Sequence, residues 1–150
     1  MKHAVLATIA LAAFAGAAFA FAPADTIRMR QANYKQMGSA MHGLIEQVRS
    51  GSPSLPQIRS RSALILRYAP QVLQWFPRGT GPEAGIRTRA KAEIWSDRQG
   101  FRLAGGRLLV AARQMDAAAR SGDIARIRAA LPALQGACGG CHESYRGPAN

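Results

Sequence analysis

Residues 124–145 read IARIRAALPALQGACGGCHESY, and this stretch decides the fold of the chain. Its apolar and bulky residues recur every three or four positions: Ile124, Ile127, Leu131, Leu134, Cys138, Cys141 and Tyr145. This spacing places them along one face of an α-helix. Ser121-Gly122-Asp123, just before the stretch, supplies a turn and a capping residue. The sequence therefore predicts a C-terminal amphipathic helix that buries this face, with a bend expected at Pro132.

Three further helices are predicted upstream of this one. Apolar residues keep the helical spacing over residues 25–49, 58–76 and 94–119. Pro70 should kink or shorten the second of these helices, and residues 77–89, rich in Gly and Pro, form the longest predicted loop. Four amphipathic helices of similar length bury their apolar faces only against one another. We therefore predict an all-α fold, an antiparallel four-helix bundle.

Composition limits the class of protein. The chain has 150 residues, with 20 Lys and Arg against 8 Asp and Glu and a formal charge of +12, which fits one modest domain. Apolar residues make up 48% of the chain, which argues against disorder, but aromatic residues only 7%, so a large apolar cofactor would add buried area to the core. The basic residues are spread along the chain without a base-reading motif, so no nucleic-acid partner is expected. A cationic surface would instead steer acidic partners or anionic lipid headgroups, and the sequence does not distinguish between them.

The N-terminus has the pattern of an export signal. Lys2 and His3 precede an Ala-rich apolar stretch that ends in Ala18-Phe19-Ala20, a small-x-small cleavage site. We predict that residues 1–20 are a cleaved signal peptide, that residues 21–150 form the mature domain, and that the protein is periplasmic. The alternative is an uncleaved membrane anchor, because the apolar run continues to Ala22. The small-residue site and the high Ala content favour cleavage, so no stable membrane anchor is expected.

The pentapeptide Cys138-Gly139-Gly140-Cys141-His142 contains the residues most able to bind a cofactor. Two thiols three residues apart on a helix share one face and can add to the two vinyl groups of a haem, while His142 can turn its imidazole onto the iron. This pattern predicts one covalently attached haem c per chain, with Cys138 and Cys141 as the attachment points and His142 as the axial iron ligand. Three alternatives are a zinc site, which lacks two further ligands, a thioredoxin-like dithiol, which lacks a preceding strand, and an inert pair of cysteines.

The mature sequence resembles the cytochromes c′ along nearly its whole length. The resemblance is carried by residues 30–38 (RQANYKQMG), Phe76-Pro77 with Gly79, Glu93-Ile94-Trp95, Ser121-Gly122-Asp123 and residues 138–146 (CGGCHESYR). A haem motif at the extreme C-terminus is highly specific, because most other small c-type cytochromes carry it near the N-terminus. The resemblance implies a haem between the helices of the bundle, with His142 as the proximal ligand of a five-coordinate iron.

The same resemblance implies roles for three neighbouring side chains. Arg146 should lie near the proximal side of the haem. Tyr34 matches the residue of the first helix that crowds the distal face, where low-spin relatives place a methionine ligand. A neutral phenol is a poor iron ligand, so Tyr34 favours an open iron. Arg30, one turn before Tyr34, either approaches a haem propionate or is an ordinary surface side chain.

Met37 and Met41 leave a second coordination state open. Both follow Tyr34 at helical spacing and share its face of the first helix. Either thioether could bind the iron, or both could be flexible core residues that fill gaps against a neighbouring helix.

We therefore expect a haem protein that is not an enzyme and that binds small diatomic gases, NO and CO, at an open iron, or transfers single electrons. The alternative is a low-spin, six-coordinate electron-transfer cytochrome with a Met ligand from the first helix. Its arginine-rich surface would steer an acidic redox partner. The resemblance also implies a homodimer formed through the first two helices.

Overall fold

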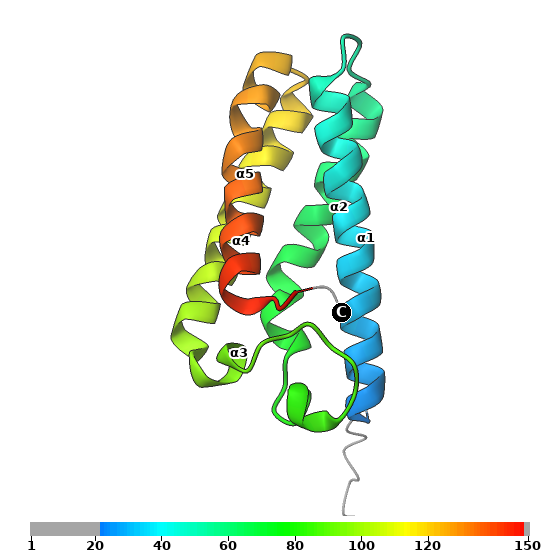
Figure 1. Ribbon diagram of the computed structural model, residues 1–150. Coiled ribbons are helices and arrows are strands. Elements are labelled where there is room, and N and C mark those ends of the chain that lie inside the picture. Colours follow the sequence, from blue (N-terminus) through cyan, green and yellow to red (C-terminus); the bar gives the residue numbers. More distant parts are fainter. Residues whose placement is uncertain (1–21, 149–150) are drawn as a thin grey trace, which may run out of the picture.

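A computed structural model describes residues 22–148 and shows four long helices (Figure 1). They are α1 (Pro23–Arg49), α2 (Leu55–Tyr68), α4 (Arg98–Ser121) and α5 (Ile124–Tyr145). Short turns at the same end of the bundle join α1 to α2 and α4 to α5 (Figure 1). Among the described residues the only β-pairing is one isolated bridge. The predicted all-α, antiparallel four-helix bundle is confirmed.

The second helix is shortened at Pro70, as predicted. The α-helix ends at Tyr68, and the chain continues as the 3₁₀ helix η1 (Ala69–Trp75). Proline lacks the N–H of the α-helical hydrogen bond and its ring clashes with the preceding turn, which explains the change. The predicted long loop follows and contains one short 3₁₀ turn, η2 (Pro82–Ala84).

The prediction of a single third helix is wrong, because this segment forms two helices. α3 (Glu93–Ser96) ends at Asp97, and α4 begins at Arg98. Asp97 has non-helical backbone angles, φ −109° and ψ 64°, and its carboxylate accepts a hydrogen bond from the amide of Gly100 at 2.9 Å. A carboxylate at this position caps the unpaired amides of the next helix. Asp97 therefore separates two helices that share one apolar periodicity.

The C-terminal helix has the predicted start and is continuous. Gly122 adopts a left-handed φ of 74° and ends α4, and the Asp123 carboxylate accepts hydrogen bonds from the amides of Ala125 and Arg126. α5 then continues through the exposed Pro132 to Tyr145. Pro132 leaves one helical hydrogen bond unmade but does not end the helix.

Aliphatic side chains from all four long helices form the centre of the bundle. Those that are at most 1% exposed include Leu44, Ile58, Ile65, Met115, Ile127 and Leu134. No helix within residues 22–148 is long and apolar enough to cross a membrane. The expected signal peptide, residues 1–20, lies outside the described residues.

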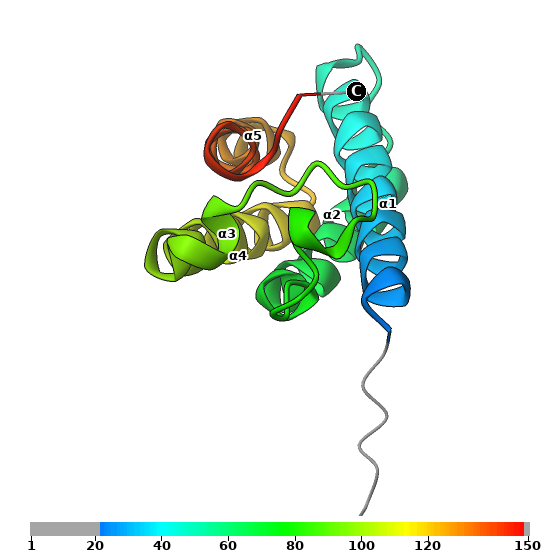
Figure 2. The same ribbon diagram turned by 60° about the horizontal axis from the view of Figure 1, so that its bottom comes forward.

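The loop before α3 crosses the open end of the bundle between α1 and the end of α5 (Figure 2). Its residues 87–91, here called the strap, are hydrogen-bonded on both sides. The Gln31 side chain of α1 donates to the Arg87 carbonyl at 2.9 Å. On the other side, the Lys91 amide donates to the Tyr145 carbonyl at 3.1 Å. The strap therefore links the first and last helices of the bundle.

Candidate haem site

A cavity of about 1170 Å³ lies between α1, α4, α5 and the strap. This volume is slightly above the usual range for small-molecule pockets, so a large flat cofactor is a suitable occupant. Every residue that the sequence analysis assigned to the haem lines it: Arg30, Tyr34, Met37, Met41, Cys138, Cys141, His142 and Arg146. The fold thus brings together two segments of the chain that are about a hundred residues apart.

The two cysteines face this cavity from α5. They are half-buried, and neither is in a disulfide. Burial raises the pKa of Cys138 to about 11, and burial also raises the pKa of Cys141. Both groups are therefore thiols at neutral pH, one helical turn apart on the same side of the helix. This is the arrangement needed to attach a haem through two thioether bonds.

The imidazole of His142 lines the cavity on the same side of α5. Partial burial lowers the pKa of His142, and the positive charges of Arg146 and Arg89 lower it further. The imidazole is therefore neutral at pH 7 and keeps a lone pair that can bind a metal. Arg146 forms the isolated antiparallel bridge with Ala90 of the strap, which fixes its backbone beside the cavity.

Tyr34 projects from α1 into the opposite side of the site. Its ring packs edge-on against Trp75, with centroids 5.1 Å apart, and lies 6.2 Å from the ring of Phe76. Burial raises the pKa of the Tyr34 phenol well above its usual value, and Arg30 only partly opposes this shift. The phenol therefore remains neutral. Met37 and Met41 line the same cavity, so the structure also places two thioethers within the site.

Arg30 is buried, with 2% of its surface exposed. The interpretation of Arg30 as a surface residue is therefore wrong. Its guanidinium donates to the hydroxyls of Thr80 at 3.0 Å and Thr88 at 2.9 Å, and it stacks on the Phe76 ring at 4.6 Å. No ion pair within residues 22–148 involves it. The charge of Glu83 acts on this guanidinium only from a longer distance than an ion pair. A buried cation is costly unless an anion pairs with it closely, and the cavity offers room for one.

A continuous series of aromatic rings forms one wall of the cavity. The Phe76 ring contacts Tyr34 at one end, and its centroid is 5.2 Å from that of Phe101. Phe101 in turn packs against Tyr145, also at 5.2 Å. The sequence predicts a role for Tyr34 but none for Phe76 and Phe101, because the spacing of these two along the chain does not distinguish helix packing from lining of the cavity.

The hydrogen bond between Asp97 and Tyr145 was not predicted. The Tyr145 hydroxyl donates to the Asp97 carboxylate at 2.9 Å, so the residue that caps α4 also holds the end of α5. Tyr145 follows His142 by three residues and lines the cavity. The N-terminus of α4 thus helps to fix the helix that carries the haem motif.

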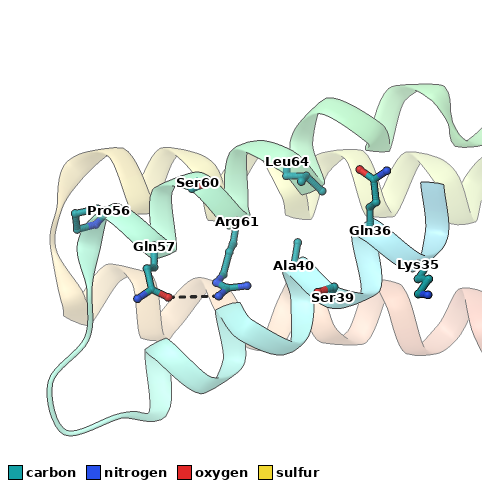
Figure 3. A pocket seen from close by; sticks show the side chains of 9 residues that line it. All are labelled: Lys35, Gln36, Ser39, Ala40, Pro56, Gln57, Ser60, Arg61 and Leu64. Atoms are coloured by element: carbon teal, nitrogen blue, oxygen red, sulfur yellow. Dashed lines mark hydrogen bonds between the residues drawn. The ribbon is translucent and has the colours of Figure 1, made fainter. Parts of the chain in front are cut away.

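A second hollow lies on the outer surface between α1 and α2 (Figure 3). Arg61 points from α2 across this groove toward α1, where a Cβ atom on Gly43 would overlap its guanidinium. The Arg61 side chain donates to Gln57 at 3.3 Å, but its Nε atom is buried without a partner. The groove adjoins the haem cavity, because Lys35 and Ser39 line both, and it contains an incompletely bonded cation.

The fold and the site define a class of protein: a c-type cytochrome built on a four-helix bundle, with its haem motif on the last helix. The sequence matches the family model described as Cytochrome C′ over residues 25–146. The chain therefore belongs to the cytochrome c′ family. Members of this family carry covalently bound haem c, and the thiol pair, neutral imidazole and cavity described above fit that cofactor.

Known relatives match this chain over most of its length. The cytochrome c′ of Pararhodospirillum photometricum is 33% identical over 125 residues, which cover 83% of this chain and 98% of the relative. The cytochrome c′ of Rubrivivax gelatinosus is 30% identical over 125 residues, which cover 83% of this chain and 95% of the relative. The solved cytochrome c′ of Thermochromatium tepidum has a TM-score of 0.79 at 25% identity, covering 85% of this chain and 98% of its own. The solved structure of a ferrous Alcaligenes xylosoxidans cytochrome c′ variant with bound NO has a TM-score of 0.76 at 26% identity. The match covers 87% of this chain and 100% of that variant.

Proposed function

We propose that this chain is a periplasmic, high-spin cytochrome whose five-coordinate haem iron binds the diatomic gases NO and CO. Cys138 and Cys141 would hold the haem, and His142 would be the one protein ligand of the iron. The haem supplies a metal with an open position for a gas. The chain supplies the attachment points, the proximal ligand and a shielded distal space. In this proposal it binds its ligand without converting it, and so it is not an enzyme.

The observation that carries this proposal is the position and state of Tyr34. Its neutral, largely buried phenol faces the haem-attachment helix across the cavity. Such a group is a weak iron ligand, yet it occupies the space where a stronger sixth ligand would sit. The rings of Trp75 and Phe76 hold it there. A crowded, apolar distal space favours small neutral diatomics over water and anions.

Two further observations support the proposal. The solved ferrous variant of the Alcaligenes xylosoxidans relative has NO bound, which makes NO the first ligand to test. Arg30 is buried beside the cavity and is in none of the ion pairs of residues 22–148, although the charge of Glu83 acts on it from further away. A haem propionate in the cavity would provide a negative charge in direct contact. We infer that Arg30 fixes the orientation of the haem through one propionate, while Arg146 lies at the proximal side.

The second candidate function is low-spin electron transfer. Met37 and Met41 both line the cavity, and a thioether bound to the iron would fill its sixth position. The two functions differ in an observable way, because a filled iron position responds little to added gas.

Optical absorption of the purified protein in its ferric and ferrous states, before and after CO or NO, tests the proposal. A broad high-spin ferrous Soret band that shifts on gas addition is expected. Sharp low-spin bands with a thioether charge-transfer feature in the ferric state and no gas response would contradict five-coordination and favour the Met-ligated carrier. Recovery of the protein in the periplasmic fraction, with residue 21 as its first residue, tests export and cleavage.

We also propose that the protein forms a homodimer through α1 and α2. The groove in Figure 3 lies between these two helices, and only Lys35 and Ser39 of its lining residues also line the haem cavity. The Arg61 guanidinium lines this groove and donates to Gln57, and its remaining N–H groups would gain acceptors from a second subunit. A C₂ dimer of this kind would bring the same surface of both chains together.

A further inference from the structure

The outward face of α4 carries a surface that neither the haem site nor the proposed dimer uses. Leu103 and Val110 are 57% and 55% exposed. They are seven residues apart, or two helical turns, and so lie on the same side of the helix. Arg102, Arg107 and Arg113 are also exposed and flank them. These five residues are called the α4 patch.

The positive charge of the α4 patch is not neutralised by the described part of the chain. The ion pairs within residues 22–148 involve Arg28, Arg120 and Arg126, and none involves an arginine of the patch. Asp116 is the one acidic residue within α4, but it is 3% exposed and paired with Arg120. The patch therefore presents two aliphatic side chains among three uncompensated cations.

The α4 patch lies beside the haem-attachment motif. The rings of Phe101 and Tyr145 pack at 5.2 Å, and α4 runs antiparallel to α5. Since both helices rise equally per residue, residues 103–110 of α4 lie level with residues 136–143 of α5. Arg107 is also near enough to Cys141 for its charge to oppose the rise in the pKa of that thiol. One edge of a haem held by Cys141 would therefore be close to the patch.

We propose that the α4 patch docks an acidic protein that delivers single electrons to the haem. The inference rests on the proposed function, because ferrous haem is the form that takes up CO. One electron leaves the reduced centre of the partner, and the ferric iron becomes ferrous. No bond forms or breaks, and no proton moves. A small apolar centre with a charged rim is typical of the weak, short-lived interfaces of electron transfer, and its charge selects a partner of opposite sign.

Stopped-flow reduction of the ferric holoprotein by a reduced, acidic [2Fe–2S] ferredoxin tests the α4 patch. We expect Arg107→Glu to lower the second-order rate constant by at least about tenfold at low ionic strength, with the difference fading as salt is added. Arg49→Glu is the matched control. Arg49 is exposed at the far end of α1, so the same change in net charge should alter the rate by less than about twofold. Calorimetric titration with oxidised ferredoxin should show weaker binding to Arg107→Glu than to the wild type or to Arg49→Glu.

Three outcomes separate this inference from the other possibilities. Equal slowing by Arg107→Glu and Arg49→Glu would overturn it, because only net charge would then matter. Loss of sedimentation with phosphatidylglycerol vesicles in Arg107→Glu, with an unchanged ferredoxin rate, would also overturn it and make the patch a membrane surface. CO binding by the dithionite-reduced wild type tests the proposed function separately. If the wild type did not bind CO but Arg107→Glu were still reduced by ferredoxin more slowly than Arg49→Glu, gas binding would be contradicted and the docking surface would still be supported.

Discussion

At the scale of single residues, the chemistry of the site depends on two side chains of α1. Tyr34 reaches the cavity with a neutral phenol, and Arg30 is 2% exposed beside the same cavity. Met37 and Met41 also line it, so the choice between an open iron and a thioether ligand depends on which α1 side chain faces the metal. A single substitution at Tyr34 therefore tests the proposed function directly.

We expect Tyr34→Ala to raise the affinity of the ferrous protein for CO by about tenfold, equivalent to ~1.4 kcal/mol. The reason is steric, because a gas that enters the wild-type site must displace a packed ring, and overpacking typically costs ~1–3 kcal/mol. Tyr34→Phe keeps the ring and should leave the affinity close to that of the wild type. Equilibrium CO titration followed at the Soret band measures both. Equal affinities in all three proteins would show that Tyr34 does not crowd the iron.

At the scale of secondary-structure elements, the ends of the helices position the site. Asp97 caps α4 and also accepts the hydrogen bond of Tyr145, so the start of one helix is tied to the end of another. The strap adds main-chain hydrogen bonds to the same end of α5. Within α5, by contrast, Pro132 weakens the helix that carries the haem motif.

Asp97→Ala should lower the melting temperature at pH 7, and the loss should shrink toward pH 3. The Gly100 amide and the Tyr145 hydroxyl bond the Asp97 carboxylate and lower its pKa in the folded protein. The stabilisation is therefore present above the unfolded pKa, near pH 4, and is lost as the pH falls through the folded value. Thermal unfolding followed by circular dichroism at both pH values checks this. Asp25→Ala, which removes only an exposed ion pair with Arg28, should change little at either pH.

Pro132→Ala should raise the free energy of unfolding by ~1–3 kcal/mol. Alanine restores the missing helical hydrogen bond and removes the clash of the proline ring, and the position is exposed, so no packing is lost. Ala133→Gly, at the neighbouring exposed position, should lower the free energy of unfolding by ~1 kcal/mol. Denaturant titrations of both holoproteins supply the values. A less stable Pro132→Ala variant would mean that the proline shapes the helix for its haem.

At the scale of the whole molecule, different surfaces are available for different partners. The groove between α1 and α2 holds Arg61 with an unpaired Nε, whereas the α4 patch carries exposed aliphatic side chains and uncompensated arginines. The haem cavity lies between α1, α4 and α5. A dimer through α1 and α2 would therefore leave the α4 patch accessible to another protein.

Ser60→Lys should shift the protein from dimer to monomer. Ser60 is exposed in the groove beside Arg61, and a further cation there would face the cations of a second subunit. Ala129→Lys makes a comparable change at an exposed position of α5 and should leave the assembly intact. Sedimentation velocity at micromolar concentration distinguishes the two. Identical behaviour of both variants would place any dimer interface elsewhere.

The sequence by itself determined the helices, most of their ends and the haem motif. These features are local: apolar spacing defines a helical face, Pro70 ends an α-helix, Asp123 caps the next one, and the haem motif is five consecutive residues. Since four amphipathic helices have few ways to bury their faces, the bundle followed from the same pattern. The likeness of residues 30–38 to the cytochromes c′ added Tyr34 and Arg30 as candidates.

Only the tertiary structure decided which of these side chains meet, and in what state. The helix ends at Asp97 although the apolar spacing continues past this residue. The hydrogen bond between Asp97 and Tyr145 joins residues that are 48 positions apart in the chain. The burial of Arg30 depends on Thr80 and Thr88, which come from a loop with no regular pattern. Main-chain hydrogen bonds join the strap to the end of α5, and such bonds do not depend on which side chains are present. Contacts between distant segments depend on how the helices and the loop pack, and local spacing does not encode that packing.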